Sequence, residues 1–337
     1  MRIGSGVSAG FVNVLNGMGQ GLFASLIIGL ILKQAGAFAG VELLVRLGTA
    51  AQLMMGPAIA AAVARSLDAP PLAVLSSLVV GAVGAGTFAG AAPAVGEPMG
   101  AAVAAVLGAL AGKAVSGRGG GSLDILLVPL CVILVGGLAG VTAAPYVARL
   151  MKALGALVNA ATEMRPFAMG IVVSTIMGVV LTLPISSAAL AISLDLSGLA
   201  AGAATVGCCC QMVGFAVASF RDNGVGGLIA QGVGTSMIQM PNIVRNPWIW
   251  LPPTLASALL GPASTVLFRM ENNSVGAGMG TSGLVGQVGT FAVMGSGAWP
   301  GIVALHVVLP ALLSLAFVEL LRRKGRIRAG DMALSVR

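Results

Sequence analysis

Apolar side chains fill long, nearly uninterrupted stretches of this chain, which short polar or glycine-rich segments separate. Runs such as Ala101 to Ala111 are apolar on every face of a helix and do not alternate with polar residues. A transmembrane β-barrel needs that alternation, so the pattern excludes a barrel and predicts membrane-spanning helices. The stretches cover residues 7–32, 49–67, 70–92, 99–116, 123–145, 167–192, 196–220, 225–242, 248–268, 275–297 and 300–321.

Four segments depart from simple spans. Residues 225–242 and 275–297 are rich in Gly, Ser, Thr, Gln and Asn, which makes them poor lipid-facing helices. We expect re-entrant or broken segments there, because irregular backbone survives at membrane depth only beside protein or a water-filled cavity. Residues 33–48 and 146–165 combine charge with apolar residues at helical spacing, and we expect both to be amphipathic helices lying along the membrane interface.

The composition agrees with a protein whose solvent is the bilayer. Hydrophobic residues make up 57% of the 337 residues and charged residues only 8%, whereas soluble domains carry about 25% charged residues. At about 20 residues per span, the length allows roughly nine to eleven crossings. The predicted fold class is an all-α polytopic membrane protein of about ten transmembrane helices, with re-entrant hairpins and interfacial amphipathic helices. The 50 glycines favour close helix packing through small faces.

The formal charge of +8 comes from short loops and from a basic tail with Arg322, Arg323, Lys324, Arg326 and Arg328. Cationic residues next to spans stay on the cytoplasmic side, so we expect a cytoplasmic C-terminus and no nucleic-acid partner. We expect no cleavable signal, because the first segment contains Asn13, Asn16 and Gln20 instead of a clean apolar core.

Polar residues are distributed unevenly along the chain. Spans before the amphipathic segment 146–165 are rich in Ala, Gly and Val, and polar residues within apolar stretches become more frequent after it. The prediction is a scaffold and dimerisation half at 1–145, an amphipathic linker at 146–165, a substrate-transport half at 166–321 and a basic cytoplasmic tail at 322–337. No internal repeat is visible.

A dense group of amides, hydroxyls and a carboxylate lies in the second half. Such groups are costly inside a membrane, so their clustering indicates a pathway more often than packing. Carboxylates, amides and hydroxyls also match a polyhydroxylated ligand, whose hydroxyls both donate and accept. The predicted substrate contacts are Glu271, Asn272, Asn273, Gln239, Asn242, Thr281, Ser282, Ser186 and Ser187.

Glu271 is the principal candidate, because it stands beside two asparagines and before the glycine-rich stretch VGAGMGTSGLVG. The alternative is a carboxylate at the end of a loop, paired with Arg269. The glycines could cradle a phosphate, but no P-loop signature follows, and the tip of a re-entrant hairpin fits better. In TLPISS, Pro184 frees a backbone carbonyl within the bilayer; a substrate site and a simple kink are both open there.

The remaining reactive side chains point to packing. His306 lies in an apolar stretch, where a proton relay or phosphoryl acceptor is conceivable but a histidine satisfied by a neighbouring helix is favoured. Cys131 and the run Cys208, Cys209 and Cys210 have no metal-ligand spacing and are expected to pack as small polarizable residues. We predict no catalytic residues, no metal site and no cofactor.

Four segments carry a family resemblance. TLPISSAAL, GAATVGCCCQMVGFAVAS, GGLIAQGVGTSMIQMPNIVRNPWIW and ENNSVGAGMGTSGLVGQ resemble enzyme IIC-like membrane proteins of the bacterial phosphotransferase system, in the branch once labelled toxin regulators. The resemblance covers nearly the whole chain. It implies a homodimeric sugar translocator in the bacterial inner membrane, with roughly ten spans, re-entrant hairpins and an elevator-like movement of a transport domain. It also implies that a glutamate in a hairpin holds the sugar, and Glu271 is the nearest match.

A complete phosphotransferase permease also needs a phosphorylatable Cys and a phosphorylatable His in soluble domains. This sequence contains neither domain, so separate cytoplasmic phosphoryl-carrier proteins are expected as partners. The expected function is therefore a sugar-translocating subunit in the lipid bilayer. Two alternatives are an uncoupled transporter of another small solute and a membrane sensor that acts through a protein partner.

Overall fold

The computed structural model describes residues 4–118 and 123–334, and every regular element in them is helical. The only extended pairing in this part of the chain is an isolated bridge between Gly198 and Asn272. The chain divides into an N-terminal unit, Met1–Leu150, and a C-terminal unit, Met151–Arg337. The division falls inside the segment that the sequence marks as a linker.

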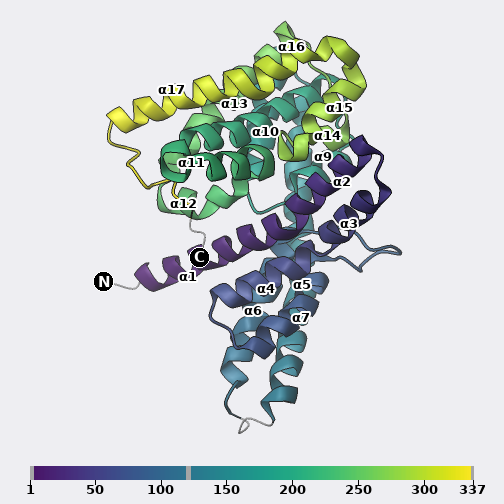
Figure 1. Cartoon of the computed structure of the whole chain (residues 1–337), viewed down its shortest axis with the longest axis vertical. Coiled ribbons are helices and arrows are strands. Elements are labelled where there is room, and N and C mark those ends of the chain that lie inside the picture. Colours follow the sequence, from purple (N-terminus) through teal and green to yellow (C-terminus); the bar gives the residue numbers. More distant parts are fainter. Residues whose placement is uncertain (1–3, 119–122, 335–337) are drawn as a thin grey trace. The chain divides into compact units, whose positions relative to one another are not determined.

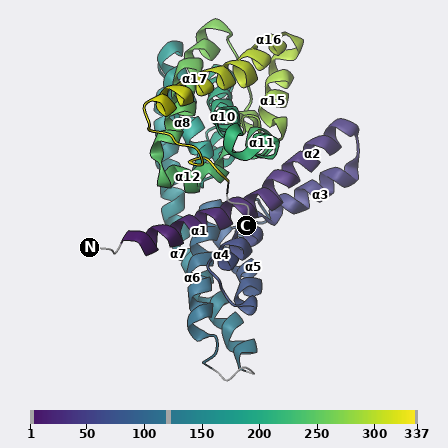
Figure 2. The same cartoon turned by 60° about the vertical axis from the view of Figure 1, so that its left-hand side comes forward.

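The N-terminal unit consists of helices that pack against one another (Figure 1). α1 (Gly4–Leu22) contacts α4 (Met55–Ser66), α2 (Ile28–Ala39) contacts α3 (Glu42–Leu53), and α5 (Pro71–Ala85) lies between α4 and α6 (Pro98–Val115). α7 (Asp124–Thr162) joins this packing through Val128 and Val132, which lie in one apolar cluster with residues of α5 and α6. Figure 2 shows the antiparallel pair α2 and α3 from a second side.

Glycine contacts bring these helices close together. A side chain on Gly56 or Gly81 would overlap the facing helix at the α4–α5 contact, and the same is true of Gly84 and Gly100 at the α5–α6 contact. In lipid, helices associate mainly through van der Waals packing, and small residues let backbones approach. The high glycine content thus serves packing in this unit, as the sequence predicts.

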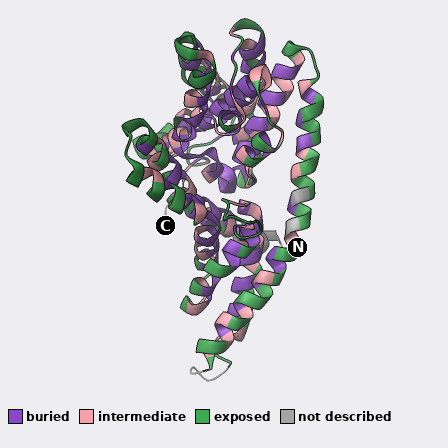
Figure 3. Cartoon of the chain, turned by 90° about the vertical axis from the view of Figure 1, so that its right-hand side faces the viewer, coloured by how far each residue is buried: buried purple, intermediate pink, exposed green. Residues whose placement is uncertain are grey.

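The C-terminal unit is built around α10 (Gly198–Ala218). Of an apolar stretch of 18 residues in this helix, 89% is buried. α8 (Pro166–Thr182), α13 (Leu251–Pro262) and α17 (Leu309–Arg323) pack against it. Cys208, Cys209 and Cys210 are free thiols on α10 with no exposed surface, which agrees with the packing role predicted for them. Figure 3 shows buried residues in the interior of this unit and exposed residues on its outer helices.

Serine hydroxyls reinforce the glycine contacts around α10. The Ser174 Oγ on α8 donates to the Ser257 carbonyl on α13 at 2.7 Å, and the Ser257 Oγ donates to the Gly207 carbonyl on α10 at 3.2 Å. A Cβ on Gly207 would overlap the Ser174 carbonyl group. The three helices are therefore joined by backbone contacts that only small residues permit.

The rest of the C-terminal unit consists of short helical pieces. One run comprises α11 (Phe220–Ile229), a π-helical turn at Ala230–Gly234, a 3-10 turn at Ser236–Gln239, α12 (Met240–Arg245) and a 3-10 turn at Pro247–Trp250. α9 (Ser187–Ser193) precedes α10. A second run contains α14 (Ser274–Ala277), a 3-10 turn at Ser282–Leu284, α15 (Val285–Met294), a 3-10 turn at Gly295–Ala298, α16 (Trp299–Gly301) and a π-helical stretch at Ile302–Val308 that leads into α17.

Both polar stretches, 225–242 and 275–297, are thus broken helices. Within 225–242 the helical backbone ends at Thr235, which is extended (φ −158°, ψ 143°), and within 275–297 it is interrupted at Gly283, which has a positive φ of 51°. Glycine adopts such values without the penalty that a Cβ brings.

Two features differ from the sequence predictions. By length and hydropathy, five helices among the described residues can cross a membrane, or six if the bent pair α3 and α4 is one span. The predicted number of about ten is not confirmed, because many apolar stretches are divided into helices of fewer than 18 residues. The prediction of a single interfacial helix over 33–48 is wrong, because two helices cover this range. α2 ends at Ala39, Gly40 follows with a φ of 67°, and α3 starts at Glu42.

The linker also differs in form. Residues 146–162 continue α7, which runs for 39 residues and contains Pro129 and Pro145. Proline weakens a helix interior by removing one hydrogen bond, but here neither proline ends the helix. The amphipathic residues 146–162 are therefore the last part of one continuous helix and not a separate one.

A Gly207→Ala substitution tests the packing around α10. The added methyl group meets the Ser174 backbone, and overpacking of this kind costs about 1–3 kcal/mol. We expect the apparent melting temperature in detergent to fall by several degrees. Gly226→Ala in α11 is the matched control, because nothing lies within 4 Å of its added Cβ. Equal melting temperatures for the two variants would contradict this account of the core.

Candidate functional site

The segment Met270–Thr290, called the polar hairpin below, lies along one side of α10. Asn272 contacts Thr205, Thr281 contacts Met212 at 3.5 Å, and Gln287 contacts Cys209 at 3.5 Å. Positions 205, 209 and 212 are three or four residues apart and share one helix face. A side chain on Gly202 would overlap the Met270 carbonyl. The small residues of α10 therefore allow the polar hairpin to approach.

Asn272 fixes the start of the polar hairpin. Its Nδ2 donates to the Thr205 Oγ1 at 2.7 Å and to the Gly286 carbonyl at 3.0 Å, while its Oδ1 accepts from the Asn273 amide at 2.8 Å. The side chain is buried. Each polar atom of Asn272 thus has a protein partner, and its role in this conformation is to hold the segment to α10.

Glu271, one residue earlier, is exposed. Its backbone amide faces the Met294 Sδ at 3.1 Å. The described ion pairs do not include Glu271, so the alternative pairing with Arg269 finds no support. The two neighbouring residues therefore differ in character, because Asn272 is a buried internal contact and Glu271 presents its carboxylate outward.

Hydroxyl groups connect the polar hairpin to other elements. The Ser187 Oγ donates to the Gly278 carbonyl at 2.6 Å, and the Ser282 Oγ donates to the Gly234 carbonyl. Asn273 and Ser186 act as helix N-caps, accepting from the backbone amides of Gly276 and Ala189. Seven of the nine predicted contacts therefore lie on the polar hairpin or at the start of α9: Glu271, Asn272, Asn273, Thr281, Ser282, Ser186 and Ser187.

Gln239 and Asn242 lie elsewhere, under the C-terminal tail. The Gln239 Nε2 donates to the Met332 carbonyl at 3.0 Å, and the Asn242 Nδ2 donates to the Ala333 carbonyl at 2.9 Å. The Gln239 Oε1 accepts from the Asn242 Nδ2 at 2.8 Å, and the Gln239 Nε2 also donates to the Gln231 Oε1 at 2.9 Å. These two predicted substrate contacts are separate from the polar hairpin group and bind the tail.

More bonds hold the tail in place. Asp222 accepts from the amides of Gly330 and Met332, and Asn223 accepts from the Leu334 amide at 2.8 Å. The Met332 side chain is fully buried. The guanidinium of Arg326 stacks over the Trp248 ring at 4.8 Å. The residues from Arg326 to Leu334 are thus held in the C-terminal unit by hydrogen bonds and packing.

A third polar group surrounds Gln211 on α10. Its Oε1 accepts from the Thr182 hydroxyl at 3.2 Å and from the Trp250 indole at 3.1 Å, and its Nε2 donates to the Thr254 hydroxyl at 3.1 Å. Thr182 also bonds the Ser236 hydroxyl at 2.8 Å. Gln211 therefore joins three elements that are distant in sequence.

Gln287 and His306 form a pair with unused polar atoms. The Gln287 Nε2 lies 3.1 Å from the His306 Nδ1. With the amide oriented in this way, Nδ1 accepts and the ring proton lies on Nε2. The His306 Nε2 and the Gln287 Oε1 are buried without a described partner. Two polar atoms of this pair thus lack a partner among the described residues.

Comparison with known proteins assigns this arrangement to a family. The family model described as "Phosphotransferase system, EIIC" matches residues 12–334, nearly the whole chain. This chain belongs to the phosphotransferase system EIIC family. No curated protein and no solved structure matches it.

The family confirms the resemblance seen in the sequence motifs. It supports, at a general level, a multi-pass membrane subunit of sugar transport. The matched range includes α10, the polar hairpin and the tail residues as far as Leu334. The polar groups described above thus belong to the EIIC module itself.

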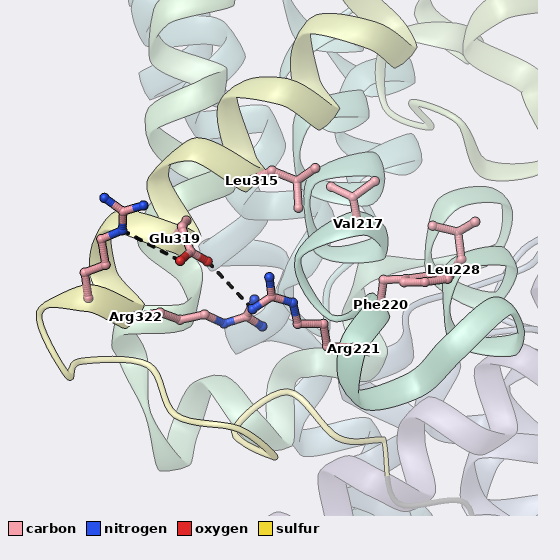
Figure 4. Close-up of a pocket in the computed structure, with 8 residues that line it drawn as sticks. Val217, Phe220, Arg221, Leu228, Leu315, Glu319 and Arg322 are labelled. Atoms are coloured by element: carbon pink, nitrogen blue, oxygen red, sulfur yellow. Dashed lines mark ion pairs between the residues drawn. The ribbon is translucent and has the colours of Figure 1, made fainter.

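The sequence did not reveal that the polar residues of the C-terminal unit form separate groups in the structure. The amides, hydroxyls and carboxylate of the second half were treated as one group, because proximity in sequence is the only distance that a sequence provides. A cavity of about 640 Å³ was also not foreseen; it is lined by Val217, Phe220, Arg221, Leu228, Leu315, Glu319, Arg322 and Arg323 (Figure 4). None of the predicted contacts lines it. Arg322 and Arg323, which begin the basic run, gave no signal beyond membrane topology, and Arg221 gave none.

An Asn272→Ala substitution tests the anchoring role of that amide. It removes the donors to Thr205 and Gly286 and leaves buried polar groups without partners, which costs about 1–3 kcal/mol. We expect a lower apparent melting temperature, measured by thermal shift in detergent. Asn159→Ala, at an exposed position of α7, is the control. A melting temperature equal to that of the control would rule out the anchoring role.

The double substitution Asp222→Ala and Asn223→Ala tests whether side chains hold the tail. Loss of their bonds to Gly330, Met332 and Leu334 should free the tail backbone. We expect trypsin to cleave after Arg326 and Arg328 at least several-fold faster than in the wild-type protein, measured by mass spectrometry of the fragments. An unchanged cleavage rate at these two arginines would show that other contacts retain the tail.

Proposed function

We propose that this protein is the sugar-translocating subunit of a phosphotransferase system in the bacterial inner membrane, with its C-terminus on the cytoplasmic side. The match of the EIIC family model to residues 12–334 carries this proposal. The chemistry of the C-terminal unit supports it, because the polar groups packed around α10 are amides and hydroxyls and no metal-binding cluster occurs among the described residues. Those groups suit a polyhydroxylated solute better than an ion.

The proposed sugar site is centred on the polar hairpin, which we take to be re-entrant. Glu271 is its principal contact, since the carboxylate is exposed and can accept from two sugar hydroxyls. Asn272 positions the segment, Asn273, Thr281 and Ser282 lie on it, and Ser187, next to Ser186, donates to its Gly278 carbonyl. Gln239 and Asn242 are assigned to tail binding and not to the sugar, because their amide nitrogens donate to Met332 and Ala333.

Sugar binding must compete with bonds that exist within the protein. Ser187 and Ser282 donate to backbone carbonyls, and Thr281 faces a thioether. A sugar hydroxyl can insert between the partners of such a pair, because it can accept from the side-chain hydroxyl and donate to the carbonyl, so that neither group is left without a partner. The Gln287 and His306 pair adds one unused donor and one unused acceptor to the same region.

We further propose that the protein works as a homodimer, with the N-terminal unit as scaffold and the C-terminal unit moving as an elevator. Separate cytoplasmic proteins supply the phosphoryl group. Transport in proteoliposomes separates this proposal from uncoupled transport. Phosphorylated sugar should form only when the phosphoryl-carrier proteins and their donor are added. Gradient-driven uptake of unmodified sugar by this protein alone would favour the uncoupled transporter.

A Glu271→Gln substitution tests the sugar site. A panel of hexoses, hexitols, pentitols and disaccharides is screened by thermal shift, and affinity is then measured for the sugar that binds. Hydrogen bonds to a charged group contribute about 1.5–3 kcal/mol, so we expect about a tenfold to hundredfold loss of affinity with an unchanged melting temperature. Glu163→Gln, at an exposed position after α7, is the control and should bind normally. Wild-type affinity in the Glu271 variant would refute the assignment.

A further inference from the structure

The cavity at the end of α17 lies apart from the proposed sugar site. Its walls come from three helices: Val217 from α10, Phe220, Arg221 and Leu228 from α11, and Leu315, Glu319, Arg322 and Arg323 from α17. Figure 4 shows the arginines and Glu319 on one side and the apolar side chains on the other. We call this site the arginine groove. It combines a strongly cationic part with an apolar wall.

The cationic part is not neutralised within the protein. Three guanidinium groups face one carboxylate, and the nearest contacts of Glu319 are 3.7 Å to Arg221 and 3.8 Å to Arg323. Charge-assisted bonds between a guanidinium and a carboxylate are normally about 2.7–2.9 Å long. Arg322 donates to the Ala218 carbonyl at 3.1 Å. Because a guanidinium carries five donors, most donors around the groove remain available for an external anion.

The apolar wall suits a hydrocarbon chain. Phe220 and Leu315 are 45% and 41% exposed, although both are large apolar side chains. Leu312 and Leu320, on the same helix as Leu315, are exposed as well. An apolar surface of this kind on a membrane protein is covered by lipid tails. Lipid tails on α17 would therefore extend into the arginine groove.

The position of the groove fits the membrane surface. α17 is apolar for most of its length and ends with Arg322 and Arg323, and Lys324 and Arg326 follow. Basic residues at the end of an apolar span lie at the level of the lipid headgroups. The cationic part of the groove is therefore at the depth of lipid phosphates, and its apolar wall is at the depth of the first acyl carbons.

We propose that the arginine groove binds an anionic phospholipid, with its phosphate on Arg221, Arg322 and Arg323 and an acyl chain along Phe220, Leu228 and Leu315. Basic pockets between transmembrane helices recognise anionic headgroups in this way. A free phosphate ion would leave the apolar wall uncovered. A zwitterionic lipid brings its own cation close to three arginines. The combination of charge and apolar surface therefore favours an anionic lipid over both.

Short-chain lipids test the proposal on the full-length protein in detergent. Dihexanoyl phosphatidylglycerol is titrated, with binding followed by native mass spectrometry and by thermal shift. Each arginine near a membrane surface contributes about 1 kcal/mol, or about a fivefold change in affinity. We expect one tightly bound phosphatidylglycerol in the wild-type protein and about a hundredfold weaker binding in the triple variant Arg221→Ala, Arg322→Ala and Arg323→Ala.

Two further variants separate binding from folding. Glu319→Gln removes the only carboxylate of the groove and should bind phosphatidylglycerol more tightly than the wild type, a gain that misfolding cannot produce. Lys324→Gln combined with Arg328→Gln removes the same kind of charge outside the lining and should leave binding unchanged. Equal binding by the wild type and the triple variant, or weaker binding by Glu319→Gln, would overturn the proposal.

Two ligand controls identify the source of the phosphate. Dihexanoyl phosphatidylcholine should bind at least tenfold more weakly than phosphatidylglycerol. Inorganic phosphate at the same concentration should not raise the melting temperature. If inorganic phosphate stabilises the protein as much as phosphatidylglycerol does, the groove is a site for a soluble phosphate and the lipid assignment is wrong.

Discussion

The close backbone contact between α10 and its neighbours is the constraint on which the rest of the C-terminal unit depends. Gly207 lets α8 approach until the Ser174 carbonyl group touches it, and Gly202 lets the chain before Glu271 cross the other part of the helix. In lipid, helices gain no hydrophobic energy from association with one another, so packing and hydrogen bonding between them must provide the stability. Small residues make both possible. The position of the polar hairpin is a direct result of this packing.

The same requirement explains the many internal polar pairs. Each hydroxyl or amide in a bilayer-embedded unit needs a partner, and here most partners are other side chains or backbone carbonyls within the unit. Asn272 and Gln211 show this most clearly, since each joins segments that are far apart in sequence. Groups that pair with one another can also pair with sugar hydroxyls, because the chemistry is shared. Structural and transport roles are therefore compatible at these positions, and Glu271 differs from them by facing outward.

The basic end of the chain combines several physical roles. Its backbone occupies the amides of Gln239 and Asn242, and its first arginines line a groove beside apolar helix surface. These roles do not compete, because they use different atoms. The tail is held through backbone carbonyls and amides, and the groove is formed by guanidinium groups of α11 and α17.

The sequence by itself determined the all-helical membrane class, the family, the buried thiols of α10 and the broken character of the two polar stretches. These properties follow from composition and local pattern, since hydropathy, glycine and amide content act within a few residues. Only the tertiary structure decided that Asn272 is an internal anchor while Glu271 is exposed, that Gln239 and Asn242 bind the tail, and that three arginines share a groove with Phe220. Each of these depends on residues brought together from distant parts of the chain, as Asn272 and Thr205 are by the glycine contacts of α10. The sequence shows which polar groups need hydrogen-bond partners, and tertiary packing decides which groups those partners are.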